Sequence, residues 1–340
     1  MKALIFKGIN DIAIENVPEP KIERPSDVII KITTSSICGS DVHTKNKGNQ
    51  EHGMVIGHEY CGVVIETGEQ VNTLKRGDRV AGRPVFNCGQ CYYCRHNQQS
   101  LCINGGIFGV LGNQGVQAEY ARIPFAENTL TKIPDFLQDD DVIFAGDILS
   151  TGMSGLIRSH VSLGDTVAVF GVGPVGLCAV ACAPLFGASL VVAIDILDYR
   201  LDFAKKFGAV VINSSKEDPA ARIKELTDNV GIDASIEAAG TEATISACLK
   251  STRRGGQVSI LGLMDKPYFF DLRKRFFDIF NLSIGFGDQN HMEGLIRLIG
   301  NGRLSLNPLI THRYSLSDAL TAYKIFENKL EKCIKILLKP

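Results

Sequence analysis

The stretch TVAVFGVGPVG, from Thr166 to Gly176, decides the fold of this chain. Its first residues are apolar and β-prone, its three glycines have the spacing G-x-G-x-x-G, and the apolar run LCAVACAPLF continues as a helix. This order is typical of the corner of a βαβ unit, where the free N–H groups of a helix N-terminus face the pyrophosphate of a dinucleotide. We expect Gly171 to make the turn, Gly173 to admit the pyrophosphate, and Gly176 to let the helix pack on the strand.

The strand that follows, LVVAID, ends in Asp195, nineteen residues beyond Gly176. A carboxylate at this place can accept both hydroxyl groups of an adenosine ribose and would repel a 2′-phosphate. The sequence therefore predicts NAD(H) in preference to NADP(H), with Pro174 and Val175 in the turn beside the phosphates. The alternative is a glycine-rich turn in a βαβ unit that binds no nucleotide.

Composition excludes several classes of protein. The chain has 340 residues with a net charge of −1, so no global field attracts nucleic acid or an anionic membrane surface. No apolar run approaches the roughly 20 residues of a membrane span. The start, MKALIFKGIN, turns polar too early for a signal peptide. We expect a cytoplasmic protein with a small-molecule substrate and without a nucleic-acid or membrane partner.

The strand and helix patterns divide the chain into two domains. From 151 to 287 strands and helices alternate, which is typical of a doubly wound parallel sheet, and Pro184 should kink or end the first helix. Residues 1–150 contain short strands separated by turns, which favours a partly open β-barrel. Residues 288–340 return to two helices and a last strand. The expected fold class is α/β, with a β-barrel domain and a doubly wound sheet domain.

A cysteine cluster lies in a short lobe at about 86–104. Its spacing is Cys88-x2-Cys91-x2-Cys94-x7-Cys102. Four thiolates so close together can surround a tetrahedral Zn²⁺ and leave no open position, so we expect a structural zinc with no role in catalysis. An iron–sulfur site and a pair of disulfides are the alternatives, and the spacing alone does not exclude an iron cluster.

Further possible metal ligands lie outside this lobe. They are Cys38 in the motif CGSDVH, His58 in the motif GHE, and Asp147 in the apolar surroundings VIFAGDIL. An unpaired carboxylate in apolar surroundings is costly, which favours metal ligation by Asp147. Taken singly, a cysteine or histidine of this kind is more often structural, and the alternatives for Asp147 are a helix N-cap and a surface carboxylate.

The order CGSDVH, GHE, CxxCxxCx7C, GDILSTG, VAVFGVGPVG and then Asp195 resembles the zinc-containing medium-chain alcohol dehydrogenase family over essentially the whole chain. In motif it is most similar to the bacterial secondary-alcohol and formaldehyde-type dehydrogenases. The resemblance implies a GroES-like barrel domain with two zinc ions, made of residues 1–150 and 288–340, and a Rossmann domain for NAD(H), residues 151–287, inserted before the final barrel segment. It also implies reversible hydride transfer between a secondary alcohol, or its ketone or aldehyde, and NAD(H), in a homo-dimer or homo-tetramer.

The resemblance also assigns roles to single residues. It implies that Cys38, His58 and Asp147 hold the catalytic zinc, and that Glu59 is the carboxylate next to this metal. It matches Ser40 and His43 with a hydroxyl and an imidazole that carry the proton of the alcohol to solvent. The remaining matches lie along the cofactor: Thr151 at the nicotinamide, Arg200 near the adenosine ribose, and Lys335 near the pyrophosphate.

The substrate stays open between several classes. Secondary-alcohol enzymes with an aspartate ligand often lack the structural zinc cysteines, which this chain has. Pro84 stands where the liver-type enzyme has an aromatic pocket wall, which favours a branched substrate. Polyol dehydrogenases usually show Glu-Pro where this chain has Asp147-Ile148, which disfavours a polyol substrate. A polyol or vicinal-diol dehydrogenase and a glutathione-independent formaldehyde dehydrogenase remain the alternatives.

Two non-enzymatic alternatives are weaker. A zinc ribbon that touches nucleic acid is disfavoured by the near-neutral charge. A cofactor-binding protein without activity need not keep three metal ligands.

Overall fold

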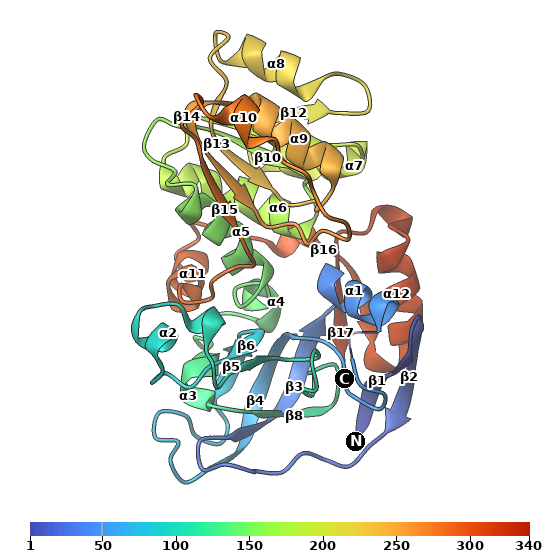
Figure 1. Ribbon diagram of the computed structural model, residues 1–340. Helices are drawn as coiled ribbons and strands as arrows, with labels where there is room; N and C mark the ends of the chain where they lie inside the picture. Colours follow the sequence, from blue (N-terminus) through green and yellow to red (C-terminus); the bar gives the residue numbers. More distant parts are fainter. Residues whose placement is uncertain (49) are drawn as a thin grey trace. The chain divides into compact units, whose positions relative to one another are not determined.

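The chain passes between two units at Asp147–Ile148 and again at Gly287–Asp288. The computed structural model describes residues 1–48 and 50–340 (Figure 1). We call Met1–Asp147 together with Asp288–Pro340 the barrel unit, and Ile148–Gly287 the nucleotide unit. The sequence placed the first boundary three residues later. In the described part of the chain, no helix combines the length and the apolar character needed to cross a membrane.

The nucleotide unit is built on a sheet of six strands, all paired in parallel. The order across the sheet is β12 (Val210–Asn213), β11 (Leu190–Asp195), β10 (Thr166–Phe170), β13 (Ile232–Glu237), β14 (Thr252–Ile260) and β15 (Asn281–Ile284). The chain moves outward from β10 in one direction to β12 and then in the other to β15. The strand order therefore reverses between β10 and β13, which is where ligands bind in doubly wound sheets.

Helices cover this sheet because parallel neighbours need long crossovers. They are α5 (Ile148–Arg158), α6 (Pro174–Cys182), α7 (Asp198–Lys206), α8 (Pro219–Leu226), α9 (Glu242–Ser251) and the short α10 (Leu272–Arg275). Helix α6 ends at Cys182, and the chain continues as a 3₁₀ turn, Ala183–Phe186, that contains Pro184. The proline thus ends the helix as the sequence predicted. The strands are apolar because both faces are buried, with Phe170, Val192 and Ile236 inaccessible to solvent.

The barrel unit contains a seven-stranded sheet. Along its main path the order is β16 (Ile310–Ser315), β17 (Lys335–Lys339), β3 (Val28–Ser36), β4 (Glu59–Thr67), β5 (Arg79–Gly82) and β9 (Leu130–Lys132), and β8 (Tyr120–Ile123) pairs with β3. Two strand pairs stand apart: β1 (Lys2–Gly8) with β2 (Asp11–Asn16), and β6 (Val85–Phe86) with β7 (Gly106–Ile107). Because β17 pairs with β3, the C-terminal segment, red in Figure 1, belongs to the same sheet as the first third of the chain.

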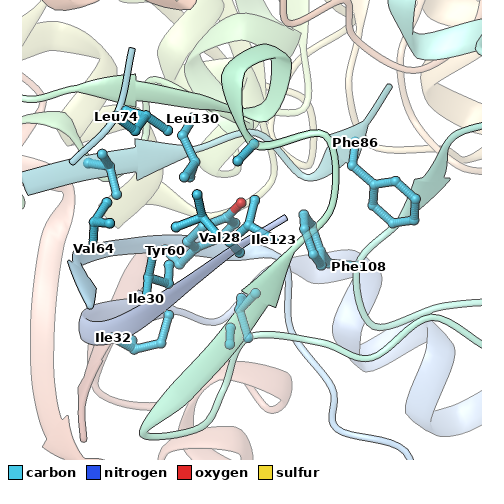
Figure 2. Close-up of a cluster of buried hydrophobic side chains, with 14 residues drawn as sticks. Val28, Ile30, Ile32, Tyr60, Val64, Leu74, Phe86, Phe108, Ile123 and Leu130 are labelled. Atoms are coloured by element: carbon cyan, nitrogen blue, oxygen red, sulfur yellow. The ribbon is translucent and has the colours of Figure 1, made fainter. Parts of the chain in front are cut away.

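Short helices complete the barrel unit. They are α1 (Gly39–Lys47), α2 (Tyr92–Arg95), α3 (Ala126–Thr129), α4 (Asp139–Val142), α11 (Met292–Gly300) and α12 (Ala319–Glu327). The main barrel core, shown in Figure 2, joins side chains from strands of this sheet with others from outside it, such as Phe108, which meets Tyr60 edge to face. A second cluster packs α12 on β1 and β17, with Tyr323, Leu4 and Ile336 among its buried members. The two clusters pack side chains of β3, β4 and β17, neighbouring strands of this sheet.

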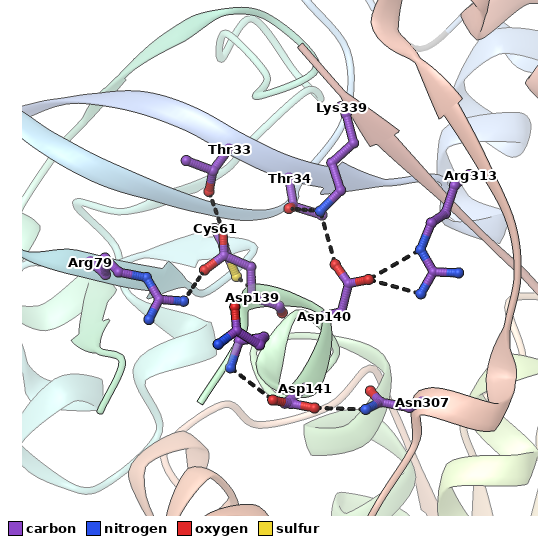
Figure 3. Close-up of polar contacts among 11 residues, drawn as sticks. Thr33, Thr34, Cys61, Arg79, Asp139, Asp140, Asp141, Asn307, Arg313 and Lys339 are labelled. Carbon is purple, nitrogen blue, oxygen red and sulfur yellow. Dashed lines mark hydrogen bonds and ion pairs between the residues drawn. The ribbon is translucent and has the colours of Figure 1, made fainter. Parts of the chain in front are cut away.

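Helix α4 is anchored by polar and charged side chains from four strands of the same unit (Figure 3). Asp139 bonds Thr33 of β3 and Arg79 of β5. Asp140 accepts from Arg313 of β16 at 2.8 Å and from Lys339 of β17 at 2.9 Å. These contacts fix the start of the segment that leads from α4 to Asp147.

Candidate metal centre and nucleotide-binding corner

Strand pairing brings Cys38 and His58 to the same place. In the antiparallel pair of β3 and β4, Ser36 lies opposite Glu59. Cys38 comes two residues after β3, and His58 comes one residue before β4, so both lie at the same end of this strand pair. Asp147 reaches them from the turn that follows α4.

The three side chains form a compact donor set. Oδ2 of Asp147 lies 3.3 Å from Nε2 of His58 and 3.4 Å from Sγ of Cys38. The three ligand atoms all lie within 4.8 Å of one another. A thiolate, an imidazole and a carboxylate are the kind of three-ligand set that binds a catalytic zinc and leaves a fourth position open.

The charges of this set also fit a bound cation. Burial opposes ionisation of Asp147, but the hydrogen bond and charge of His58 outweigh it and lower the pKa of Asp147 to about 2. Burial likewise opposes the charged form of His58, yet Asp41 and the groups around it raise the pKa of His58 well above its usual value. Burial and the charge of Asp147 raise the pKa of the Cys38 thiol. The acidic groups around the site thus favour positive charge there, and binding of Zn²⁺ would displace protons from its ligands.

Asp41 is a member of the site that sequence reasoning missed. Its Oδ1 lies 2.9 Å from Nδ1 of His58, and its Oδ2 accepts the backbone N–H of Cys38 at 2.9 Å. A carboxylate on Nδ1 fixes the imidazole so that Nε2 faces the metal. One buried carboxylate therefore orients two of the three candidate ligands. Its position inside the CGSDVH motif was the available signal.

Glu59 and Lys335 form an ion pair beneath the candidate ligands. Lys335 is fully buried and donates to the Glu59 carboxylate and to the carbonyl of Ile37, the latter at 2.7 Å. Burial raises the pKa of Glu59, the charge of Lys335 opposes that rise, and the resulting pKa is about 7. The structure therefore places Lys335 next to Glu59, and its contact with a pyrophosphate stays a prediction.

Ser40 and His43 both belong to helix α1. The hydroxyl of Ser40 lies 3.2 Å from Nε2 of His58, beside the candidate metal ligands. His43 is half-buried one turn further along the helix. The structure thus brings Ser40 to the site, while the relay of a proton through both residues stays a prediction.

The four clustered cysteines converge in the lobe between β6 and β7. The Sγ atom of Cys91 lies 3.5 Å from that of Cys94 and 3.8 Å from that of Cys102, which is 3.5 Å from that of Cys88. Burial opposes ionisation of Cys88, but hydrogen bonds from the backbone of Gln90 and the amide of Asn104 outweigh it and lower the pKa to about 6. Four sulfur atoms at these distances fit a tetrahedral metal ion.

The nucleotide-binding corner has the geometry expected for its glycines. Gly171 follows β10 with φ of +87°, and a Cβ on Gly176 would lie 2.0 Å from the carbonyl oxygen of Gly171. At Gly173 a Cβ would meet only the Arg200 guanidinium, at 3.6 Å, so this backbone stays open to a close approach. Pro174 and Val175 open helix α6, whose N-cap is Gly173.

Asp195 ends β11 beside this corner. Its carboxylate accepts backbone N–H groups from Val172 at 2.9 Å and from Ile196 at 2.8 Å, and Arg200 lies 3.7 Å away. The carboxylate is therefore fixed next to the glycine turn, where the ribose of a bound dinucleotide is expected. Thr151 lies elsewhere in the same unit, buried in α5, and its contact with the nicotinamide stays a prediction.

A doubly wound sheet with this corner, joined to a barrel with two metal-ligand clusters, defines a zinc-binding, dinucleotide-dependent oxidoreductase. Residues 24–135 match the alcohol dehydrogenase GroES-like domain, and residues 174–301 match the zinc-binding dehydrogenase family. The chain therefore belongs to the zinc-containing medium-chain alcohol dehydrogenase family, which confirms the family and the fold class that the sequence predicted.

Individual relatives are similar to this chain over its full length. An alcohol dehydrogenase of Cupriavidus necator is 38% identical, in an alignment that covers 100% of this chain and 99% of that protein. The solved structure of alcohol dehydrogenase TADH from Thermus sp. ATN1 is 37% identical with a TM-score of 0.95, and covers 100% and 99% of the two chains. A sorbitol dehydrogenase of Bacillus subtilis is 32% identical, in an alignment that covers 100% of this chain and 97% of that protein.

The chain is thus a zinc-dependent, NAD(P)-linked dehydrogenase that acts on the CH–OH group of a small molecule. The cluster of Cys38, His58 and Asp147 fits the catalytic zinc, and the four-cysteine cluster fits the structural zinc.

Proposed function

We propose that this protein interconverts a secondary alcohol and its ketone with NAD(H), at a zinc ion held by Cys38, His58 and Asp147. The observation that carries the proposal is the convergence of these three ligand atoms within 4.8 Å of one another. We further propose that Cys88, Cys91, Cys94 and Cys102 hold a zinc that only stabilises their lobe, because four thiolates leave no position for a substrate.

The residues around the metal have distinct tasks. When bound, zinc makes an alcohol more acidic, and the nicotinamide takes up the hydride. Asp41 holds the imidazole of His58 in the orientation that offers Nε2 to the metal. Ser40, which lies against that nitrogen, would take up the proton that the alcohol loses while giving its own hydroxyl proton, through the ribose hydroxyl of the cofactor, to His43, which releases a proton to solvent. Lys335 keeps Glu59 in place beside the ligands.

Removal of one ligand tests the catalytic metal site. Asp147→Ala should lower the zinc content from two ions per chain to one and abolish turnover, because two ligands hold zinc weakly. The measurement is zinc per chain after dialysis, together with the rate of ketone reduction. Asp135→Ala is the matched control, because Asp135 is an exposed aspartate earlier in the same segment. A variant at position 147 that kept both zinc ions and full activity would contradict the proposal.

A panel of carbonyl substrates tests the substrate class. Pro84, if it lines the pocket, leaves more room beside the carbinol carbon than an aromatic side chain, which supports a branched substrate. We expect acetone or a longer ketone to be reduced faster than acetaldehyde or formaldehyde. Preference for fructose or acetoin would favour the polyol or vicinal-diol alternative, and the sorbitol dehydrogenase among the relatives makes that comparison worthwhile.

We propose NAD(H) as the preferred cofactor because Asp195 offers a fixed carboxylate beside the glycine turn. A 2′-phosphate next to this carboxylate would be repelled, so rates with NADH should exceed those with NADPH by about tenfold or more. Asp195→Ser should reduce that preference. Asp202→Ser, at an exposed position of α7, should leave the preference as in the parent protein. A parent protein that worked better with NADPH would refute this assignment.

We also propose that the protein is a homo-oligomer of the cytoplasm. The edge strand β15 and the segment before it expose large apolar side chains, including Phe277 at 81% and Ile284 at 71%, which supports burial against a second copy. The clustered thiols must stay reduced to bind zinc, which supports a reducing compartment.

A further inference from the structure

A buried chain of hydrogen bonds runs from helix α12 to the imidazole of His58. The hydroxyl of Tyr323 donates to Oε1 of Gln117 at 2.8 Å, and Nε2 of Gln117 donates to Oδ2 of Asp41 at 3.2 Å. Oδ1 of Asp41 then meets Nδ1 of His58 at 2.9 Å. All four side chains are buried, with exposed fractions between 0% and 6%.

The amide of Gln117 is oriented by its surroundings. Its Nε2 faces two acceptors, the carboxylate of Asp41 and the carbonyl of Ser36 at 3.1 Å. Its Oε1 faces the hydroxyl of Tyr323, which can donate. With the amide turned around, an oxygen would face the Asp41 carboxylate and an NH₂ group would face the tyrosine. The tyrosine hydroxyl therefore holds the donor end of Gln117 toward Asp41.

The backbone around Gln117 is fixed as well. Its N–H donates to the carbonyl of Ile56, and its own carbonyl accepts from Leu4, both at 2.9 Å. The neighbouring Val116 donates to the carbonyl of Gly57, the residue before His58. The Gln117 side chain thus starts from a backbone that is tied to the segment carrying the metal ligand.

We propose that Gln117 and Tyr323 are positioning residues for the catalytic zinc, acting through Asp41 on the imidazole of His58. The inference rests on the proposed metal site. Without Gln117, the Asp41 carboxylate keeps its contacts with His58 and with the N–H of Cys38 but loses the third contact that fixes its orientation. The C-terminal segment, which supplies Tyr323, thereby supports a ligand that lies far earlier in the chain.

Zinc affinity at the catalytic site is the quantity to measure. Purified protein is titrated with a chelator of known zinc affinity, and the zinc left per chain is counted, with the ion in the four-cysteine lobe as an internal reference. Loss of a residue that supports a metal ligand costs about 10–100-fold in affinity. We expect about tenfold weaker catalytic zinc binding for Gln117→Met, which keeps the length of the side chain. Loss of one hydrogen bond in Tyr323→Phe should cost about three- to tenfold.

Tyr60→Phe is the matched control. Tyr60 is fully buried in the same unit, and its hydroxyl has no hydrogen-bond partner among residues 1–48 and 50–340. Tyr60→Phe removes a buried tyrosine hydroxyl without breaking a hydrogen bond that the structure describes, so it shows what the truncation alone does to zinc binding. We expect parent-like affinity for Tyr60→Phe.

A double-mutant cycle separates positioning from packing. Asp41→Ala removes the residue through which Gln117 and Tyr323 are proposed to act. Tyr323→Phe should therefore weaken zinc binding in the parent protein but cause no further loss in the Asp41→Ala background. An equal effect in both backgrounds would overturn the proposal, because the tyrosine would then act by another route.

His58→Ala distinguishes failure of this inference from failure of the metal site. If His58→Ala keeps the chelator-sensitive zinc, the proposed ligand set is wrong. If His58→Ala loses that zinc while Gln117→Met and Tyr323→Phe bind it as tightly as the parent, only the positioning role is wrong. Should Gln117→Met fail to fold, as judged by loss of the structural zinc, Tyr323→Phe carries the test alone.

Discussion

Gly57 meets two constraints in the structure. Its backbone has φ of +92°, which favours glycine. A Cβ at this position would lie 2.4 Å from Cγ of Gln117, the side chain that supports Asp41. The glycine before His58 therefore leaves room for the buried amide as well as making the turn.

We predict that Gly57→Ala weakens both the fold and the catalytic metal site. The strained backbone and the displaced Gln117 together should cost about 1–3 kcal/mol in the free energy of unfolding, and catalytic zinc should be lost more readily. Gly53→Ala is the control, because Gly53 has a similar φ of +87° with nothing within 4 Å of the added Cβ. Thermal unfolding and zinc content are measured for both variants. The comparison separates the effect of backbone strain, which both share, from the effect of the clash with Gln117, which only Gly57→Ala has. Equal losses in the two variants would show that the collision with Gln117 has no effect.

At the scale of single residues, local motifs decide what the sequence could predict. Cys38 and His58 were identifiable because each lies in a short motif beside the end of a strand. Gln117 was not, because its contact with Asp41 spans 76 residues and its contact with Tyr323 spans 206. Lys335 likewise meets Glu59 across 276 residues, so its partner could not be inferred from spacing.

At the scale of elements, helix α4 connects the strands of the barrel unit to the segment that ends in Asp147. Four residues make a weak helix, so its position depends on the side chains that hold it. Asp140 is the central contact, since it bonds Arg313 of β16 and Lys339 of β17 (Figure 3). Partial burial opposes ionisation of this carboxyl, but its hydrogen bonds with Lys339 and Arg313 outweigh burial and hold its pKa below the ordinary value.

We predict that Asp140→Asn destabilises the protein at pH 7 and that the difference from the parent disappears in acid. A carboxyl with a lowered folded-state pKa contributes stability above its unfolded pKa of roughly 4, and this stability is lost as the pH falls through the folded value. Because both cations are about half exposed, the loss at pH 7 should be only about 1 kcal/mol.

Unfolding of parent and variant at pH 7 and at about pH 2 makes this comparison, because the contribution is lost only as the pH falls through the lowered folded-state pKa. Asp135→Asn, at an exposed site, should match the parent at both pH values. A difference for Asp140→Asn that persists unchanged in acid would exclude the ionised carboxylate as its cause.

Individual helices and strands could be predicted from the sequence where several local signals point to the same element. Asp218-Pro219 starts α8, and the Asp218 side chain accepts the N–H of Ala220 at 3.1 Å. The strands of the nucleotide unit were recognisable as apolar runs, because a parallel sheet is buried on both faces. The pairing of β17 with β3 was harder to predict, because the two strands lie at opposite ends of the chain and no local pattern indicates their register.

At the scale of the whole molecule, the edge strand of the nucleotide-unit sheet is a candidate surface for association between copies of the chain. Within the described residues, β15 pairs only with β14 and forms the end of the six-stranded order. Its side chains Leu282 and Ile284 are exposed, as are Phe276, Phe277 and Ile279 in the segment before it. An edge strand with free N–H and C=O groups and apolar side chains can extend its sheet by pairing with another copy of itself. A second copy of this chain is therefore the expected partner for this edge.

We predict that Ile284→Lys shifts the protein from oligomer to monomer in sedimentation velocity. A lysine on an edge strand blocks strand pairing, and two copies related by a two-fold axis would bring like charges together. Leu163→Lys is the control, since Leu163 is 91% exposed in the same unit but lies outside this strand and the segment before it. We expect the Ile284 variant to keep both zinc ions, because position 284 lies outside the barrel unit that holds the proposed ligands. If the parent sedimented as a monomer, or if both lysine variants dissociated alike, β15 would not be the site of association.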